Sequence, residues 1–257
     1  MLLRAKIICL IVLLFAVPAR AEATAGITIL SDSTLSFAMS ALAREYTREH
    51  QVMVGTSFAD SEAQQAQIDE GGEADVLITT RTGWIESLKT QGVVDVYSET
   101  IIARNRLALA SGLSFPVEPR SDGVFPLTEL LKAFGWQQAF VVASPDALDE
   151  GRFSREALRN LGVSSDLEEY TLYVKSRPLM ESMIRDQHMA GIVLSSMLTD
   201  APGFKLIDLL PETSHTPIHY FAVVIAGDNM EEARRFLQFL GTDTAKEILR
   251  KHGFFVD

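Results

Sequence analysis

The chain has 257 residues, of which 34 are Asp or Glu and 23 are Lys or Arg, so its formal net charge at neutral pH is −11. This acidic surplus argues against nucleic acids and anionic membranes as partners, because both are polyanions that proteins bind through basic surfaces. It does not decide the charge of a small ligand, since neutral donors lining a pocket can hold an anion inside an acidic protein.

The first 21 residues have the pattern of a cleaved secretory signal. Arg4 and Lys6 are followed by an apolar stretch over residues 7–17 and by the small-residue cleavage site Ala19-Arg20-Ala21. The stretch is shorter than the roughly 20 residues of a membrane span, so we expect a periplasmic protein that is not inserted in a membrane. Cleavage lowers the formal charge from −11 to −14 and removes Cys9, the single cysteine, so no disulfide or lipid-bearing cysteine remains.

Strand-like and helix-like segments then alternate along the chain. The early segments are strands at residues 27–30, 52–58 and 74–79 and helices at 35–46, after Ser61 and from 84 onward, with Ser61 as the N-cap of a capping box. The middle adds helices at 127–134, 153–161 and after Ser176, strands at 139–143, 172–174 and 191–194, and a surface loop at 114–125. The end adds a strand at 219–226 and helices at 231–240 and 243–251. This alternation predicts an α/β protein with mostly parallel sheets covered by helices on both faces.

Several of these segments occur in an order and spacing that resemble the molybdate-binding proteins of bacterial ABC importers. They are Thr34-Leu35, Ser57-Phe58-Ala59-Asp60-Ser61, Ala74-Asp75-Val76-Leu77-Ile78-Thr79, Trp84, and the ending with Ala245-Lys246-Glu247-Ile248 and His252-Gly253-Phe254. The resemblance covers nearly the whole mature chain. It implies the two-lobed, type II periplasmic-binding-protein fold, with crossover strands near residues 105–110 and 218–224. Lobe 1 would then comprise residues 22–105 and 219–257, and lobe 2 residues 106–218.

The resemblance also implies a ligand site in the cleft between the lobes. Helix N-termini with hydroxyl side chains supply N–H and O–H donors there, which suits a doubly charged oxyanion without any cationic side chain. The hydroxyl ligands of the family fall on Thr34, with Ser33 beside it, and on Ser61, with Asp60 beside it, while a backbone donor falls on Ser176. The alternative for each hydroxyl is an ordinary helix cap.

Two positions depart from the family pattern. Glu150, before Gly151, stands where the family has a small apolar residue that offers its backbone N–H, and Leu194 replaces a hydrogen-bonding tyrosine. If Glu150 faces the cleft, each unit charge about 4 Å away costs roughly 4 kcal/mol at an effective dielectric near 20. Asp32, Asp60 and Glu62 add to this repulsion if they turn inward, and otherwise favour the helix dipole while facing solvent.

The expected function is therefore that of a periplasmic solute-binding protein that serves an ABC permease and binds molybdate or tungstate. The alternatives are a divergent protein for a neutral or cationic molecule or a metal ion, or a sensor or delivery domain outside transport. We expect no cofactor, no metal site at His215 and His219, and a monomer. We also expect no catalysis, because the sequence has no G-x-S-x-G elbow, no phosphate-cradling glycine loop and no cysteine in the mature chain.

Overall fold

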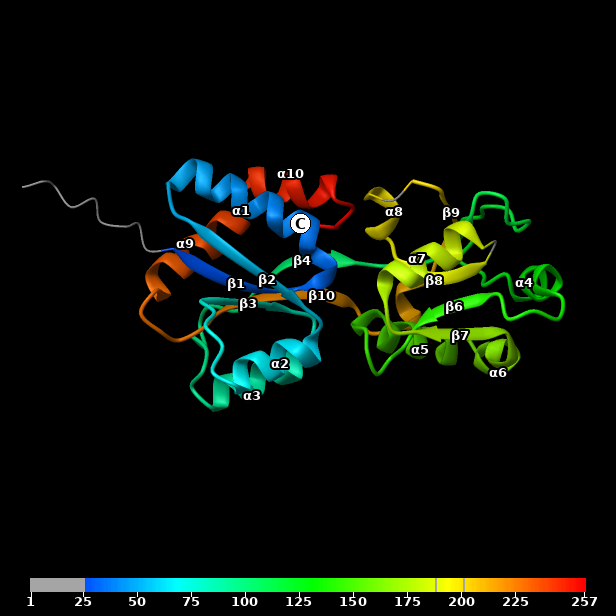
Figure 1. Cartoon of the computed structure of the whole chain (residues 1–257), viewed down its shortest axis with the longest axis horizontal. Coiled ribbons are helices and arrows are strands. Elements are labelled where there is room, and N and C mark those ends of the chain that lie inside the picture. Colours follow the sequence, from blue (N-terminus) through cyan, green and yellow to red (C-terminus); the bar gives the residue numbers. More distant parts are fainter. Residues whose placement is uncertain (1–25, 188, 201) are drawn as a thin grey trace, which may run out of the picture.

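The structure is a computed structural model that describes residues 26–187, 189–200 and 202–257, and the predicted signal at residues 1–21 lies outside this part. The helices and strands form two lobes side by side, each built on a five-stranded sheet (Figure 1). The two-lobed α/β fold predicted from the sequence is thereby confirmed. Among the described residues, no helix combines the length and the apolar character that crossing a membrane requires.

Lobe 1 is the unit around the first sheet, and it contains both ends of the described chain. Its strands are β1 (Ile27–Asp32), β2 (Val54–Ala59), β3 (Val76–Thr79), β4 (Thr100–Asn105) and β10 (Ile218–Val224). Its helices are α1 (Ser36–His50), α2 (Ser61–Asp69), α3 (Thr82–Thr90), α9 (Met230–Leu240) and α10 (Asp243–Lys251), with a 3₁₀ turn at Ser33–Leu35.

Lobe 2 is the unit around the second sheet. Its strands are β5 (Leu107–Gly112), β6 (Phe140–Ala143), β7 (Thr171–Val174), β8 (Ala190–Leu194) and β9 (Phe204–Leu209). Its helices are α4 (Leu127–Phe134), α5 (Asp149–Asn160), α6 (Ser164–Leu167), α7 (Arg177–Asp186) and α8 (Met197–Asp200), and 3₁₀ turns cover Glu168–Tyr170 and Glu212–Ser214. The lobe limits at residues 105–106 and 218–219 stay a prediction. The strands β4 and β5 on either side of the first limit belong to different sheets, whereas the second limit falls one residue inside β10, which belongs to the sheet of lobe 1.

The two sheets share one topology. The order is β2-β1-β3-β10-β4 in lobe 1 and β7-β6-β8-β5-β9 in lobe 2. In each, three neighbouring strands are parallel and the fourth runs antiparallel to both of its neighbours. Because parallel strands end at the same edge, the residues that follow β1 and β2 lie together, on the side of lobe 1 that faces lobe 2 (Figure 1).

Each sheet is buried on both faces, which explains why its central strands are apolar throughout. In lobe 1, α1, α9 and α10 cover one face over Ile27 and Ile29, while α2 and α3 cover the other, where Leu30 and Leu77 pack with Trp84 (Figure 1). In lobe 2, α7 packs on one face of the sheet, and α4 and α5 pack on the other. Burying one such aliphatic side chain contributes about 1.5–3 kcal/mol, so these layers are the main source of stability.

Two local predictions are wrong in a way that matters for the cleft. The N-cap of α2 is Asp60, whose carbonyl accepts the Gln64 N–H at 2.9 Å, so Ser61 is the first helical residue and not the cap. Helix α5 begins at Asp149 rather than at residue 153, which places Asp149 and Glu150 in its first turn. Gly151 permits this early start, because a Cβ there would lie 2.5 Å from the Ala143 carbonyl oxygen at the end of β6.

Candidate ligand-binding site

Lobe 1 contributes to the cleft the polar residues that follow β1 and β2. Asp32 ends β1 and caps the 3₁₀ turn, accepting hydrogen bonds from the Thr34 N–H at 2.9 Å and from Thr34 Oγ1 at 2.6 Å. Asp60 follows β2, and its Oδ1 accepts from Ser33 Oγ at 3.0 Å. Ser61 Oγ lies 3.2 Å from Thr79 Oγ1, where β3 ends.

Lobe 2 contributes the first turns of α5 and α7. Asp149 and Glu150 begin α5, and Arg177 is the first residue of α7. Glu150 is 1% exposed, and its carboxylate receives both Arg177 Nε at 2.6 Å and Arg177 Nη2 at 2.7 Å. This is the two-pronged geometry that favours a guanidinium–carboxylate ion pair.

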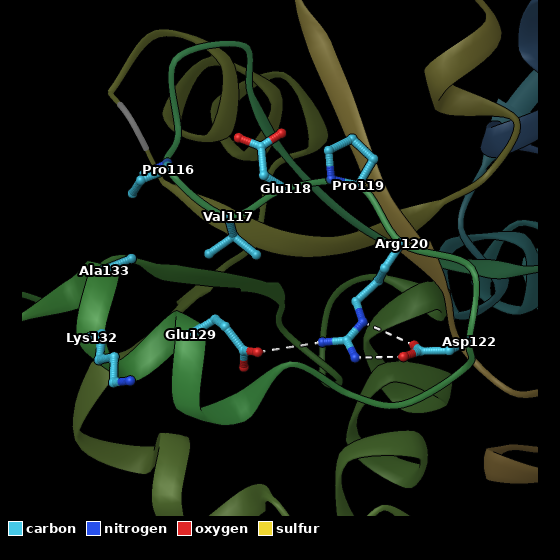
Figure 2. Close-up of a pocket in the computed structure, with 9 residues that line it drawn as sticks. All are labelled: Pro116, Val117, Glu118, Pro119, Arg120, Asp122, Glu129, Lys132 and Ala133. Carbon is cyan, nitrogen blue, oxygen red and sulfur yellow. Dashed lines mark hydrogen bonds and ion pairs between the residues drawn. The ribbon is translucent and has the colours of Figure 1, made fainter.

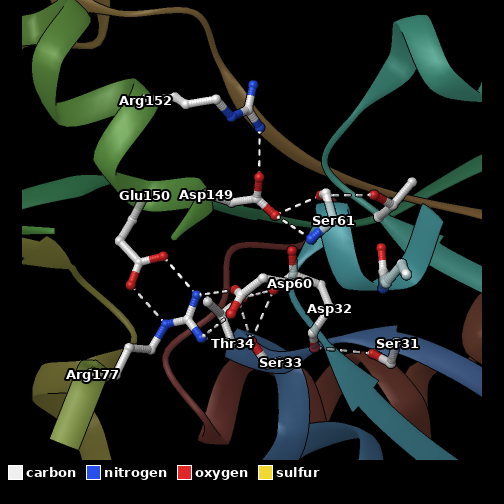
Figure 3. Close-up of polar contacts among 12 residues, drawn as sticks. Ser31, Asp32, Ser33, Thr34, Asp60, Ser61, Asp149, Glu150, Arg152 and Arg177 are labelled. Carbon is white, nitrogen blue, oxygen red and sulfur yellow. Dashed lines mark hydrogen bonds and ion pairs between the residues drawn. The ribbon is translucent and has the colours of Figure 1, made fainter. Parts of the chain in front are cut away.

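The same guanidinium crosses to lobe 1. Arg177 Nη2 donates to Asp60 Oδ1 at 2.5 Å, and Nη1 donates to Ser33 Oγ at 2.5 Å and to Asp60 Oδ2 at 3.4 Å (Figure 3). Burial disfavours the charge on Arg177, yet Glu150 and Asp60 together raise its pKa above the ordinary value. We call the contact of Arg177 with Asp60 and Ser33 the cationic clasp.

A second contact of opposite polarity joins the lobes beside the first. Asp149 Oδ2 accepts from the Ser61 backbone N–H at 3.0 Å and from Ser61 Oγ at 2.5 Å, while Asp149 Oδ1 accepts from Arg152 at 2.8 Å (Figure 3). The Ser61 N–H is one of the unpaired donors at the start of α2, where the helix dipole also favours an anion. We call this contact of Asp149 with Ser61 the anionic clasp.

Asp32 is buried next to these contacts with one oxygen unused. Its residue exposure is 0%, and Oδ2 has no hydrogen-bond partner among the described residues. Burial and the nearby Asp149 carboxylate raise the pKa of Asp32 to about 7, although Arg177 and the hydrogen bonds from Thr34 act in the opposite direction. Asp32 is therefore the group in the cleft whose charge changes near neutral pH.

A buried hydroxyl chain connects Thr34 to the crossover strands. Thr34 Oγ1 lies 2.7 Å from the Tyr220 hydroxyl on β10, to which Asn105 Nδ2 donates at 3.3 Å from the end of β4. Asn105 also donates to Ser196 Oγ at 2.8 Å in lobe 2. Burial and the charge of Asp32 raise the pKa of Tyr220, so its hydroxyl stays protonated and can donate.

The structure brings together most of the residues singled out in the sequence. Ser33, Asp60 and Glu150 meet at Arg177, Thr34 lies against Asp32, and Ser61 lies against Asp149. Ser176 is different, because it is exposed at the N-cap of α7 and its side chain makes no cap hydrogen bond. Glu62 is exposed as well. Of the four carboxylates whose direction the sequence left undecided, Asp32, Asp60 and Glu150 therefore turn toward the cleft and Glu62 turns toward solvent. Whether any of these residues contacts a ligand stays a prediction.

Sequence reasoning missed Arg177, Asp149 and Arg152. A signal was present for Arg177, since it follows Ser176, at which the resemblance already placed a ligand contact. The sequence offered no signal that Asp149 pairs with Ser61, because 88 positions separate the two residues.

Two grooves elsewhere on the surface could also hold a small solute. The larger, about 640 Å³, is an open groove on lobe 2 between the segment 116–122 and α4, and Arg120 in it is paired with Asp122 and Glu129 (Figure 2). A groove of about 440 Å³ lies between the lobes and is lined by the start of α3 and by Arg152 and His219. The second fits a small solute better, because it adjoins the anionic clasp through Arg152 and includes Thr80, whose buried Oγ1 has no partner in the described chain.

Two α/β lobes with matching topology, joined by crossover strands and facing each other across a polar cleft, define the class of two-lobed solute-binding proteins. The chain belongs to the family of bacterial extracellular solute-binding proteins, whose family model matches residues 27–255.

Individual relatives agree with this assignment. The chain is 27% identical over 245 residues to the molybdate-binding protein ModA of Escherichia coli, covering 94% of each chain. It is 24% identical over 234 residues to ModA of Haemophilus influenzae, covering 90% of this chain and 91% of that protein. The periplasmic molybdate-binding protein of Azotobacter vinelandii has the same fold, with a TM-score of 0.73 at 20% identity over 90% of this chain and 99% of that one. The predicted resemblance to molybdate-binding proteins is thereby confirmed.

Proposed function

We propose that the protein captures a small polar solute between its lobes in the periplasm and passes it to an ABC permease. The observation that supports this proposal most directly is that polar groups of the two lobes meet across the cleft. Lobe 1 contributes Ser33, Asp60 and Ser61, and lobe 2 contributes Asp149 and Arg177. Lobe closure around a ligand that contacts both lobes shifts the population toward the closed state, which a permease can then recognise.

The names of the relatives support an oxyanion as the first ligand to test. The Ser61 N–H and hydroxyl already hold a carboxylate oxygen of Asp149, so this pair of donors accepts an anion. Glu150 argues against a free dianion, because its carboxylate lies in the cleft and is already paired with Arg177. An oxyanion is therefore the first ligand to test because of the relatives, but the cleft itself favours a solute that is not a simple dianion, and oxyanion capture is our second candidate function.

We propose binding without catalysis. The relatives are named as binding proteins, and the most buried serine of the cleft, Ser61, is hydrogen-bonded to a carboxylate and a threonine hydroxyl, with no histidine base beside it. A nucleophilic serine needs such a base within hydrogen-bond reach. The signal at residues 1–21 and the monomeric state belong to the same proposal.

The test is a titration of the chain from residue 22 onward, followed by thermal unfolding and calorimetry. The panel contains molybdate, tungstate, sulfate, calcium, amino acids and polyamines. A ligand at 100 times its dissociation constant adds about 2.7 kcal/mol of stability, which is easily resolved. Ser61→Ala should weaken the binding, and Ser87→Ala, at an exposed position on α3, should leave it unchanged. If no compound binds and native mass spectrometry of protein purified from the periplasm finds no bound small molecule, the proposed function is wrong.

A further inference from the structure

The contacts that bridge the cleft come in two opposite polarities. In the cationic clasp, a guanidinium of lobe 2 binds a carboxylate and a hydroxyl of lobe 1, Asp60 and Ser33. In the anionic clasp, a carboxylate of lobe 2 binds the N–H and hydroxyl of Ser61 in lobe 1. A ligand that enters between the lobes interrupts both clasps.

Separation of the lobes leaves the ion pairs inside lobe 2 intact. Glu150 stays paired with Arg177, and Arg152 stays paired with Asp149, because all four residues belong to lobe 2. In lobe 1, Ser33, Asp60 and Ser61 lose their partners from lobe 2, while Ser33 and Asp60 stay hydrogen-bonded to each other. Each lobe then presents one group that can bind a cation and one that can bind an anion. These groups are Asp60 and Ser61 in lobe 1, and Asp149 and Arg177 in lobe 2.

The charges that a ligand of this cleft must carry follow from the free-energy cost of leaving these groups unpaired. A buried charge or donor that loses its partner without replacement is strongly destabilising, so a tightly held ligand must replace both clasps. Its anionic group would take the donors of Ser61 and Arg177. Its cationic group would take the carboxylates of Asp60 and Asp149.

Ligands with a single sign of charge fail this condition. A dianion satisfies Ser61 and Arg177 but offers no cationic group to Asp60, which loses Arg177, or to Asp149, which keeps Arg152. A metal ion has no ready site, since no group of three or more His, Cys, Asp or Glu residues in the described chain is arranged to hold one. It would also lie close to the Arg177 guanidinium, which occupies the space between Glu150 and Asp60 (Figure 3).

Two unpartnered atoms point to the same answer. Asp32 is fully buried, and its Oδ2 has no partner among the described residues, so in the ionised form, above its pKa of about 7, Asp32 can accept a ligand N–H beside Asp149 and Arg177. Thr80 Oγ1 is also unpartnered, and it lines the groove between the lobes beside Arg152. A simple oxyanion has no donor for the ionised Asp32 carboxylate, whereas an ammonium or guanidinium group has several.

We propose that the ligand is a small zwitterion with one carboxylate and one ammonium or guanidinium group, as in a free amino acid or a guanidino acid. The carboxylate binds Ser61 and Arg177, and the cationic group binds between Asp60 and Asp149. This inference rests on the proposed function, because it names the chemical class of the solute that the cleft captures.

Calorimetric titration with matched compounds tests the inference. The zwitterions are glycine, γ-aminobutyrate, guanidinoacetate and arginine, and the analogues whose charges are all of one sign are butyrate, butylamine and agmatine, with molybdate and sulfate as inorganic anions. At least one zwitterion should bind saturably, and each analogue that lacks one of its charges should bind at least 100-fold more weakly.

Asp60→Asn separates the charge effect from a loss of folding. This variant should weaken binding of the zwitterion at least tenfold and strengthen binding of molybdate, because it removes one carboxylate and leaves the Ser61 donors in place. Asp69→Asn, at an exposed position on the same helix, should change neither affinity. Melting curves of both variants show that the cleft is still folded.

Each remaining outcome overturns the inference in a recognisable way. If molybdate or sulfate binds the unmodified protein more tightly than every zwitterion, the ligand class is wrong and the proposed capture function stands. The same holds if butylamine or agmatine binds as tightly as the zwitterions. If nothing in either panel binds, the inference fails, and the proposed function fails with it when native mass spectrometry also finds no bound small molecule.

Discussion

Arg177 of lobe 2 and Asp60 of lobe 1 are joined across the cleft by a hydrogen bond of 2.5 Å between Nη2 and Oδ1. The same guanidinium holds Glu150 by two further hydrogen bonds, so one side chain neutralises a buried carboxylate of the cleft and also joins the two lobes. A protein of this class needs a cleft that opens and closes. The stability of this contact therefore sets how readily the lobes separate.

Arg177→Met should destabilise the protein by about 3–5 kcal/mol, because it leaves the buried Glu150 carboxylate without its partner. Denaturant unfolding measures the loss. Adding Glu150→Gln to this variant should recover much of it, since a neutral amide no longer buries an unpaired charge. Arg185→Ala, an exposed arginine on the same helix, is the control and should leave the unfolding midpoint where it was. Equal effects of both arginine substitutions would contradict the role given to Arg177.

Arg177→Met should also open the lobes in the absence of ligand. The cationic clasp is lost, while the anionic clasp of Asp149 with Ser61 still bridges the lobes beside it. Small-angle X-ray scattering should show a larger radius of gyration than that of the unmodified protein. An unchanged radius in a folded variant would mean that the clasp does not hold the lobes closed.

Ser61→Ala should lower the free energy of unfolding by about 1.5–3 kcal/mol, the usual contribution of a hydrogen bond to a charged group. The Ser61 backbone N–H still reaches Asp149, so the contact weakens without disappearing. The matched control is again Ser87→Ala on α3, which is exposed and should be nearly neutral. A loss no larger than that of the control would show that the Ser61 hydroxyl contributes nothing to the anionic clasp.

Asp32 should make stability depend on pH in a direction opposite to that of a paired carboxylate. Its pKa rises from 3.8 to about 7 on folding, so between these values the folded protein holds a proton that the unfolded chain has released. The resulting stabilisation is complete below about pH 4 and is lost as pH rises through about 7. Asp32→Asn should remove this dependence, so the difference in unfolding free energy between variant and unmodified protein should change between pH 4 and 7. A constant difference would contradict the assignment.

Gly151→Ala should destabilise the protein by about 1–3 kcal/mol, because the added Cβ would lie 2.5 Å from the Ala143 carbonyl oxygen and push α5 away from β6. Glu150 would move with it. Gly83→Ala on α3 is the control, since nothing lies within 4 Å of a Cβ there and alanine favours a helix by up to about 1 kcal/mol. Thermal unfolding of both variants should therefore show shifts of opposite sign.

The central elements could be predicted because their patterns are local. The strand at residues 139–143 and the helices at 127–134 and 243–251 match β6, α4 and α10 to within a residue. Strands β4 and β9 were missed, and β5 was expected only as the crossover that the resemblance implied near residues 105–110, since all three are defined by antiparallel pairing with segments far along the chain. The limit between Asp60 and Ser61 was misplaced because both residue types are common N-caps, and the choice depends on whether Asp60 turns to Arg177.

The sequence by itself determined the class of the protein, because apolar periodicity and the order of short segments are local properties of the chain, and the resemblance that those segments carry implied the candidate positions Ser33, Thr34, Asp60, Ser61, Glu150 and Ser176. It could not decide whether a carboxylate at the start of a helix points into the cleft or to solvent, since the helix dipole stabilises the carboxylate in both orientations. Only the tertiary structure decided this. It brings α5 and α7 of lobe 2 against β1, β2 and α2 of lobe 1, so that Asp149 meets Ser61 and Arg177 meets Asp60, contacts made by residues 88 and 117 positions apart.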